Sequence, residues 1–461
     1  MRAPRLDAAE LRTVRRPVAA PVRPGFFSAL ALTALGASAF AVAFRGLLTL
    51  VYRALTGADN AVSAMRALPL PARLLLPVIG GLLAGLTGLA AARLPSSHGV
   101  GDVMEAAVLG RVRLSLRVTL LKCLGSFSAI VSGGSLGREG PLIQFGAALG
   151  QTLGRGVQAT GVEARALVAA GAAAGFAAAY NTPFAAVLFV VEVVVGVVAL
   201  ETLAPVLVAV VLASTVSRAL GDSGPLFGHH NFETQSPLEL AAFALVGALA
   251  AVAGHGFLHL LSTVEGRYRH VVPTLPWRPA LGALGTGLVL VVLPDVAGNG
   301  AEPLRLVLDA RLGAGALALL LGAKVLATAS SVGSGSPGGV FTPTMLLGGG
   351  VGALTAMGLH ALGIPAGASG GYALVGMASA VAGTTHAPIM AAVLAFEMTG
   401  DYAIVLPLML ATTVAVVVAQ RLSPESLYTR ELLARGVRWR LSVEGGRVVE
   451  REELVSNGEG I

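Results

Sequence analysis

Two glycine-rich segments carry the residues of this chain that could do chemistry. Residues 133–141 read GGSLGREGP and residues 333–343 read GSGSPGGVFTP, and an apolar run follows each terminal proline. Glycine permits a flexible entry, and proline is favoured just inside the start of a helix. Each segment is therefore predicted to hold a helix N-terminus, whose free N–H groups and partial positive charge bind anions. We predict that Gly137, Arg138 and Gly140 contribute to such a site.

Glu139 is the acidic residue of the first segment. A carboxylate at this place could simply cap the helix dipole. Alternatively, it lies in the path of the anion, because a carboxylate and an anion would compete for the same N–H groups. In that case, protonation or outward movement of Glu139 would open the path.

Other chemistries fit the sequence less well. The stretch GSGSPG at 333–338 matches the dinucleotide-binding pattern, but that motif needs a preceding strand and a βαβ unit. Ser132 and Ser135 have no histidine placed nearby as a base, so we predict no enzymatic activity. The single Cys123 matches no metal motif, and we predict neither a metal nor a cofactor.

The elements that must position these residues are membrane-spanning helices. Of 461 residues, 55% are hydrophobic and only 12% are charged, against about a quarter charged in soluble proteins. A helix needs about 20 mostly apolar residues to cross a membrane. Runs of about that size lie at 26–51, 69–92, 163–200, 203–220, 237–262, 279–297, 313–332, 371–396 and 402–420.

The chain also contains an internal repeat. Its only two lysines, Lys122 and Lys324, each lie 19 residues before a proline, Pro141 and Pro343. Other residues recur at matched spacing: Ser132 with Ser334, Gly137 with Gly339, Gly146 with Gly348, Gly150 with Gly352, Gly171 with Gly376, Pro183 with Pro388, and Glu192 with Glu397. Because transporters often place the substrate site between two repeats, we predict two halves of inverted topology. We expect a packing role for both repeated glutamates.

The arginines predict the topology. They cluster before the first apolar run and after the last one, so the positive-inside rule places both termini in the cytoplasm. This distribution does not indicate nucleic-acid binding. The predicted division is a cytoplasmic segment 1–25, a membrane repeat 26–220, a connecting loop 221–236, a second repeat 237–421, and a final stretch 422–461. That last stretch holds the end of the last helix and a tail too short for a pair of regulatory domains.

Four stretches carry a family resemblance. GREGP at 137–141, GVFTP at 339–343, GAAAGFAAAYNTPFAAVLFVVE at 171–192 and FEMTGDY at 396–402 resemble the chloride channel (CLC) family of channels and chloride/proton antiporters. The resemblance covers roughly 26–430. It implies an all-α polytopic membrane fold with two inverted repeats and broken or re-entrant helices. It further implies chloride as the bound and transported ion, and a homodimer in the lipid of a cell (plasma or inner) membrane, with a pore in each subunit.

The resemblance also implies roles for single residues. Glu139 matches the gating glutamate of the family. Gly339, Val340 and Phe341 match the segment whose backbone N–H groups hold the central chloride. Tyr428 resembles the tyrosine whose hydroxyl touches that ion from the cytoplasmic side.

Two departures from the family pattern bear on function. The family motif GSGIPE reads SHGVGD at 97–102, so His98 stands where a serine would donate its hydroxyl. Either a His98 N–H donates instead, or only backbone contacts at Gly99 and Val100 are left. At the second departure, Val193 follows Glu192 where antiporters carry the inner proton acceptor. Channel members have valine there, so the sequence favours channel-type conduction of the voltage-gated kind over proton antiport.

Overall fold

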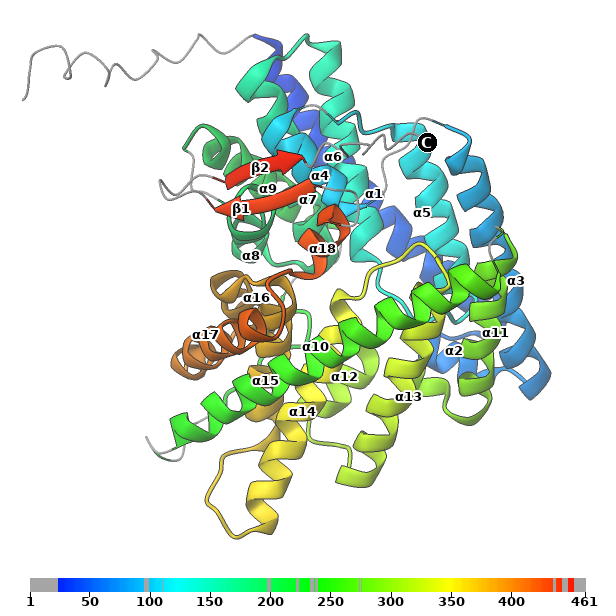
Figure 1. The fold of residues 1–461 in the computed structure, drawn as a ribbon, viewed down its shortest axis with the longest axis vertical. Coiled ribbons are helices and arrows are strands. Elements are labelled where there is room, and N and C mark those ends of the chain that lie inside the picture. Colours follow the sequence, from blue (N-terminus) through cyan, green and yellow to red (C-terminus); the bar gives the residue numbers. More distant parts are fainter. Residues whose placement is uncertain are drawn as a thin grey trace, which may run out of the picture.

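A computed structural model shows how the predicted helices are arranged (Figure 1). It describes residues 24–94, 99–110, 112–196, 200–220, 224–232, 236, 239–272, 274, 276–433, 437–441 and 447–451. In this described part, eight helical stretches are long and apolar enough to cross a membrane. The prediction of an all-α membrane region is confirmed. Two short antiparallel strands in the tail, β1 (Val437–Leu441) and β2 (Arg447–Arg451), were not predicted.

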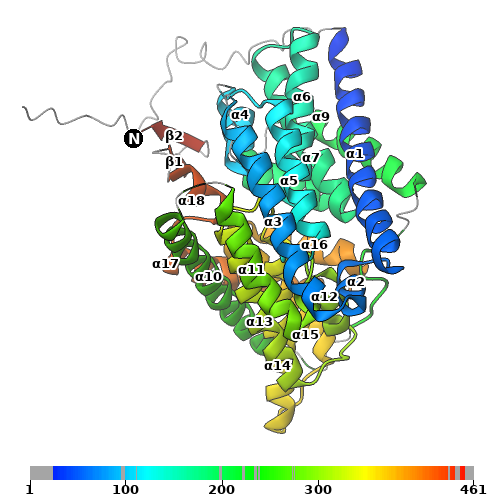
Figure 2. The same ribbon diagram turned by 90° about the vertical axis from the view of Figure 1, so that its right-hand side faces the viewer.

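The helices form two sets along the chain, and most members of each set lie together, while α2 and α3 reach the second set and α18 reaches the first (Figures 1 and 2). The first set is α1 (Gly25–Thr56), α2 (Ala61–Ala67), α3 (Leu70–Ala92), α4 (Val100–Leu109), α5 (Leu116–Val131), α6 (Glu139–Gly156), α7 (Gly161–Tyr180), α8 (Pro183–Leu188), the π-helix η2 (Phe189–Val195) and α9 (Leu200–Ala219). The second set is α10 (Glu239–Val271), α11 (Trp277–Val292), the 3-10 helix η3 (Pro294–Val296), α12 (Ala301–Leu308), α13 (Ala314–Gly333), α14 (Phe341–Ala361), α15 (Ser369–Thr385), α16 (Pro388–Thr399), α17 (Val405–Leu422) and α18 (Leu427–Leu433). The domain limits given above stay a prediction.

Two of the apolar runs are broken and do not form single helices. The run at 163–200 divides at Asn181, and the run at 371–396 divides at His386. Both residues adopt left-handed backbone, with φ of 56° and 59°, and end a helix two residues before a proline. Proline cannot continue a helix because it lacks the N–H group and its ring clashes with the preceding turn. Apolar length alone therefore gave the wrong boundaries for these two runs.

Matched glycines make the same contact in both halves. A Cβ added to Gly146 would lie 2.0 Å from the carbonyl oxygen of Gly171, and one added to Gly348 would lie 2.3 Å from that of Gly376. These glycines hold α6 against α7 and α14 against α15 at a separation that no side chain permits. The halves meet where α3 lies beside α11 (Figure 2). The repeat found in the sequence is thus a structural repeat.

The two repeated glutamates join the halves reciprocally. The carboxylate of Glu192 accepts hydrogen bonds from the N–H groups of Ile389 at 3.3 Å and Met390 at 2.7 Å, at the start of α16. The carboxylate of Glu397 accepts from Phe184 at 3.0 Å and Ala185 at 2.8 Å, at the start of α8. Each half therefore caps a helix of the other half, which confirms the predicted packing role.

This reciprocity predicts the effect of neutralising either glutamate. Glu397→Gln keeps the shape of the side chain but removes the charge that strengthens two hydrogen bonds across the halves. We expect a loss of about 1–3 kcal/mol in stability, measured as a lower thermal unfolding temperature in detergent. Glu192→Gln should give a similar loss, and Glu201→Gln, at an exposed position in the first turn of α9, should give a smaller one. Equal unfolding temperatures for all three variants would contradict the capping role.

Candidate functional site

The two glycine-rich segments meet where the two halves join. The N–H of Gly137 donates to the carbonyl of Gly339 at 2.6 Å, and the N–H of Gly339 donates back to Gly137 at 2.8 Å. These two glycines are partners in the sequence repeat. The helices that follow, α6 and α14, begin at Glu139 and Phe341, as the prolines predicted. Two helix N-termini from opposite halves are thereby fixed beside each other.

Hydroxyl groups anchor the first loop to the second half. The Ser135 hydroxyl lies 2.8 Å from that of Thr328, and the Ser135 N–H donates to the Ser331 hydroxyl at 3.2 Å. All three residues are buried. Because each polar group has a partner, this junction avoids the cost of unpaired polar atoms in an apolar interior.

Glu139 occupies the N-terminus of the opposite helix. Its side chain is 2% exposed, and its Oε1 accepts the N–H of Phe341 at 2.9 Å, with a longer contact of 3.5 Å from the Thr342 hydroxyl to Oε2. Glycine makes room for this carboxylate. A Cβ on Gly339 would lie 2.1 Å from Oε1, and one on Gly137 would lie 2.2 Å from it. A negatively charged group thus sits where the helix start of α14 would hold an anion.

An aromatic wall extends from this point towards α18. The Tyr180 hydroxyl lies 3.0 Å from that of Thr342, and the Tyr180 ring is 5.6 Å from the ring of Phe341. At the other end, Phe189 lies 6.0 Å from Tyr428, which is 7% exposed. Sequence reasoning identified Tyr428 but missed Tyr180 and Phe189. Both residues lie in the stretch 171–192 that carries the family resemblance, and Tyr180 stands just before the helix break at Asn181.

The other predicted site residues divide into three groups. Val340 is the N-cap of α14, and a Cβ on Gly140 would lie 3.8 Å from the N atom of Gly339, so both belong to the central junction. Gly99 and Val100 form the start of α4, while His98 lies outside the described residues. Val193 is buried in η2. Within the described ranges, no group of three or more His, Cys, Asp or Glu residues could hold a metal ion.

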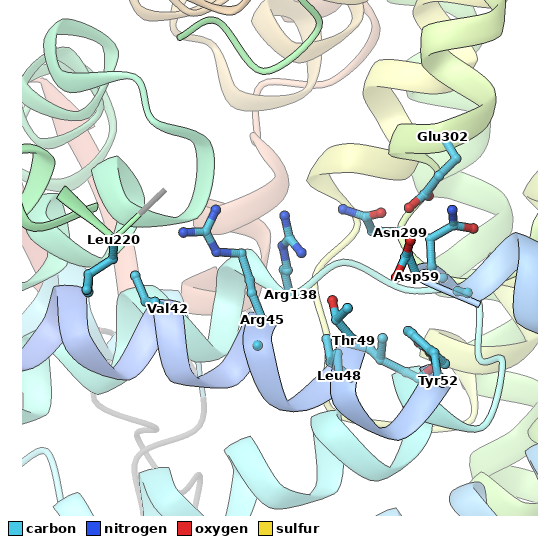
Figure 3. A pocket seen from close by; sticks show the side chains of 15 residues that line it. Val42, Arg45, Leu48, Thr49, Tyr52, Asp59, Arg138, Leu220, Asn299 and Glu302 are labelled. Atoms are coloured by element: carbon cyan, nitrogen blue, oxygen red, sulfur yellow. Dashed lines mark hydrogen bonds between the residues drawn. The ribbon is translucent and has the colours of Figure 1, made fainter. Parts of the chain in front are cut away.

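A cavity of about 360 Å³ opens beside Arg138 (Figure 3). Arg45 of α1 and Arg138 point into the same space, while Asn299 and Glu302 line it from the second half. Arg138 was predicted, whereas Arg45 was missed, although it is an arginine inside the first apolar run. The lining carries two cations, Arg45 and Arg138, and two carboxylates, Asp59 and Glu302, and it reaches the residue next to Glu139.

Comparison with known proteins agrees with this architecture. The family described as voltage gated chloride channel matches residues 80–420. A putative chloride channel protein ClcB-like from Ralstonia nicotianae is 41% identical over 398 residues, which are 85% of this chain and 92% of that protein. The voltage-gated ClC-type chloride channel ClcB of Escherichia coli is 34% identical over 363 residues, 77% of this chain and 86% of the relative.

Solved structures give the same fold. A slow cyanobacterial chloride/proton antiporter has a TM-score of 0.78 at 25% identity and covers 90% of this chain and 98% of its own. A CLC-type fluoride/proton antiporter has a TM-score of 0.71 at 25% identity, over 87% of this chain and 97% of its own. On this match of family, sequence and architecture, the chain belongs to the voltage-gated chloride channel (CLC) family and is a membrane protein of chloride transport.

Proposed function

We propose that this protein conducts chloride passively along a path that the carboxylate of Glu139 closes. The observation that carries the proposal is the 2.9 Å hydrogen bond from the Phe341 N–H to Glu139. That N–H group is part of a helix start, which is a ready-made place for an anion. A carboxylate and a chloride ion cannot occupy it together.

The competition defines how the gate works. A hydrogen bond to a charged group contributes about 1.5–3 kcal/mol, so the carboxylate holds its place against a dilute anion. Once Glu139 takes up a proton or swings away, the Phe341 N–H is free to bind chloride. Gly137 and Gly339 leave the space that the entering ion needs.

The two ends of the path have different chemistry. At the cavity, Arg45 and Arg138 offer full positive charges beside the carboxylates of Asp59 and Glu302, so an anion is attracted there close to the two arginines. At the other end, the Tyr428 hydroxyl is a neutral donor beside the aromatic wall. We propose that chloride passes between these two ends, with the central junction as the narrow point.

Passive conduction rests on Val193. A valine at this place in η2 has no group that can carry a proton. The alternative is chloride/proton exchange on the same fold, which is favoured by the two solved structures described as proton antiporters. Both modes use Glu139.

Several expectations accompany the proposal. We propose that the protein is a homodimer with a path in each subunit, in the plasma or inner membrane, with both termini in the cytoplasm. We also propose that His98 contributes a donor next to Gly99 where a serine stands in the family pattern. None of these alters the role given to Glu139.

Neutralising the gate tests the proposal directly. In liposomes, Glu139→Gln should conduct chloride about tenfold faster than the unaltered protein near neutral pH, because an amide competes weakly for the Phe341 N–H. Its flux should not depend on pH. The exposed Glu201→Gln variant is the control and should behave as the unaltered protein. A flux in Glu139→Gln that still rose steeply at low pH would show that another group is the gate.

Proton movement separates the two modes. The purified protein is placed in chloride-loaded liposomes under an imposed chloride gradient, with a pH electrode in the outer solution. We expect chloride to run down its gradient without driving protons uphill. Uphill proton movement coupled to chloride would establish exchange and overturn passive conduction.

The cavity arginines predict a concentration effect. Arg45→Gln should raise the chloride concentration for half-maximal flux about threefold or more at low ionic strength, with a smaller effect at high ionic strength, because salt screens charges. Arg267→Gln, at an exposed position of α10, is the control and should change nothing. If Arg45→Gln matched the control at every salt concentration, the cavity would not be the chloride entrance.

A further inference from the structure

Two opposite charges face the cavity beside α6 without pairing with each other. Arg138 is the N-cap of α6 in the first half, and Glu302 lies in the first turn of α12 in the second half. Both line the cavity of about 360 Å³, with Arg45 near Arg138 and Asp59 near Glu302 (Figure 3). Among the residues that the structure describes, neither Arg138 nor Glu302 makes a hydrogen bond or an ion pair. The cavity therefore separates a positive side from a negative side.

The charges nearest to Glu302 are engaged elsewhere. Arg305, one turn along α12, donates to the carbonyl of Leu226 at 2.7 Å. Asp59, the other carboxylate of the lining, forms an ion pair with Arg53. Since charged groups out of bulk water are stabilised by partners, Glu302 stands out as a half-buried carboxylate for which the described part of the chain supplies none.

The helix dipole alone does not explain the position of Glu302. An acidic residue in the first turn stabilises a helix, and Glu201 fills that role in α9 at an exposed position. The start of α12 also has a cap, because Oδ1 of Asn299 accepts the N–H of Ala301 at 3.2 Å. Glu302 instead is half-buried, and its carboxylate is directed into the cavity (Figure 3).

The arrangement fits a molecule that carries both charges. A simple anion would pair with Arg138 but would be repelled by Glu302, and a simple cation would meet the opposite problem. A zwitterion pairs with both sides at once, through charge-assisted hydrogen bonds. The cavity volume lies at the small end of the range of about 300–1,000 Å³ for small-molecule sites. Val42, Leu48 and Ile130 add an apolar wall that suits a short hydrocarbon chain.

We propose that this cavity binds a small amino acid as a zwitterion, with the ligand carboxylate on Arg138 and the ligand ammonium on Glu302. Binding does not require chloride transport, so the inference goes beyond the proposed function. It touches that function at one point. An amino acid beside Arg138 obstructs the place where we propose that chloride enters, so occupancy of the site lowers chloride flux.

Calorimetric titration of the purified protein in detergent, at low chloride, tests the binding. The probes are glycine, β-alanine and γ-aminobutyrate, whose two charges lie progressively farther apart. Acetate and methylammonium are the controls that carry one charge each. The best of the three probes should bind about tenfold or more tightly than either control, the order expected for one added charge-assisted hydrogen bond. If no probe binds more tightly than acetate, the inference is overturned.

A substitution on the negative side identifies the partner of the ammonium. Glu302→Gln should weaken binding of the best zwitterion about tenfold and should not weaken binding of acetate, because acetate needs only Arg138. Glu201→Gln removes a first-turn glutamate from another helix and is the matched control, which should leave both affinities unaltered. An equal loss for zwitterion and acetate in Glu302→Gln would contradict the pairing, since a disturbed cavity would explain it. If Glu302→Gln does not fold, the comparison of probes on the unaltered protein still decides.

Flux measurements separate this inference from the proposed function. In liposomes under a chloride gradient, the best-binding amino acid on both sides should reduce chloride flux at concentrations near its Kd, and less so at high chloride. Binding without any change in flux would support the amino-acid site and contradict the cavity as the chloride entrance. Chloride flux without binding of any probe would overturn the site and leave the proposed function standing.

Discussion

The reciprocal hydrogen bonds between Gly137 and Gly339 are the contact on which the rest of the structure depends. They bring two chain segments about 200 residues apart into one backbone pair, in a place where a Cβ on either residue would meet the carboxylate of Glu139. From this pair the helices α6 and α14 begin. Two helix N-termini at one point give an apolar interior a positive potential without a full charge.

Symmetry of the backbone combined with asymmetry of the side chains produces the site. In the repeat, Glu139 and Phe341 occupy equivalent positions, two residues before Pro141 and Pro343. The carboxylate of one therefore lies at the helix start of the other and accepts its N–H. A second glutamate in place of Phe341 would set two like charges against each other. The arrangement avoids this repulsion because only one of the two equivalent positions carries a carboxylate.

Buried charge elsewhere in the chain fixes loops rather than moving ions. Lys324 is 2% exposed, and its ammonium donates to the carbonyls of Val296 at 2.8 Å and Gly298 at 2.7 Å. These residues lead to Asn299, which lines the cavity beside Arg138. A buried ammonium is tolerated only when its hydrogen bonds are satisfied. Lys324 thus holds in place the loop that contributes Asn299 to the cavity lining.

Local chemistry explains what could be predicted from the sequence. Apolar runs, glycine and proline at helix starts, and the matched spacing of the repeat predicted the membrane class, the two halves, the starts of α6 and α14, and the family. These features depend on neighbouring residues or on a regular offset along the chain. The same signals gave the wrong boundaries at Asn181 and His386, because apolar length outweighed the prolines that follow them.

Only the tertiary structure decided which distant side chains share a space. Arg45 and Glu302 line the same cavity as Arg138, although more than 90 residues separate the first from Arg138 and more than 160 the second. No periodicity or motif links such residues, since their proximity follows from how whole helices pack. The sequence by itself determined that the chain lies in a membrane, that it contains an internal repeat, and that Glu139 stands at the start of the first repeated helix. The fold determined which charges face that acid, because electrostatic interactions depend on distance in space and not along the chain.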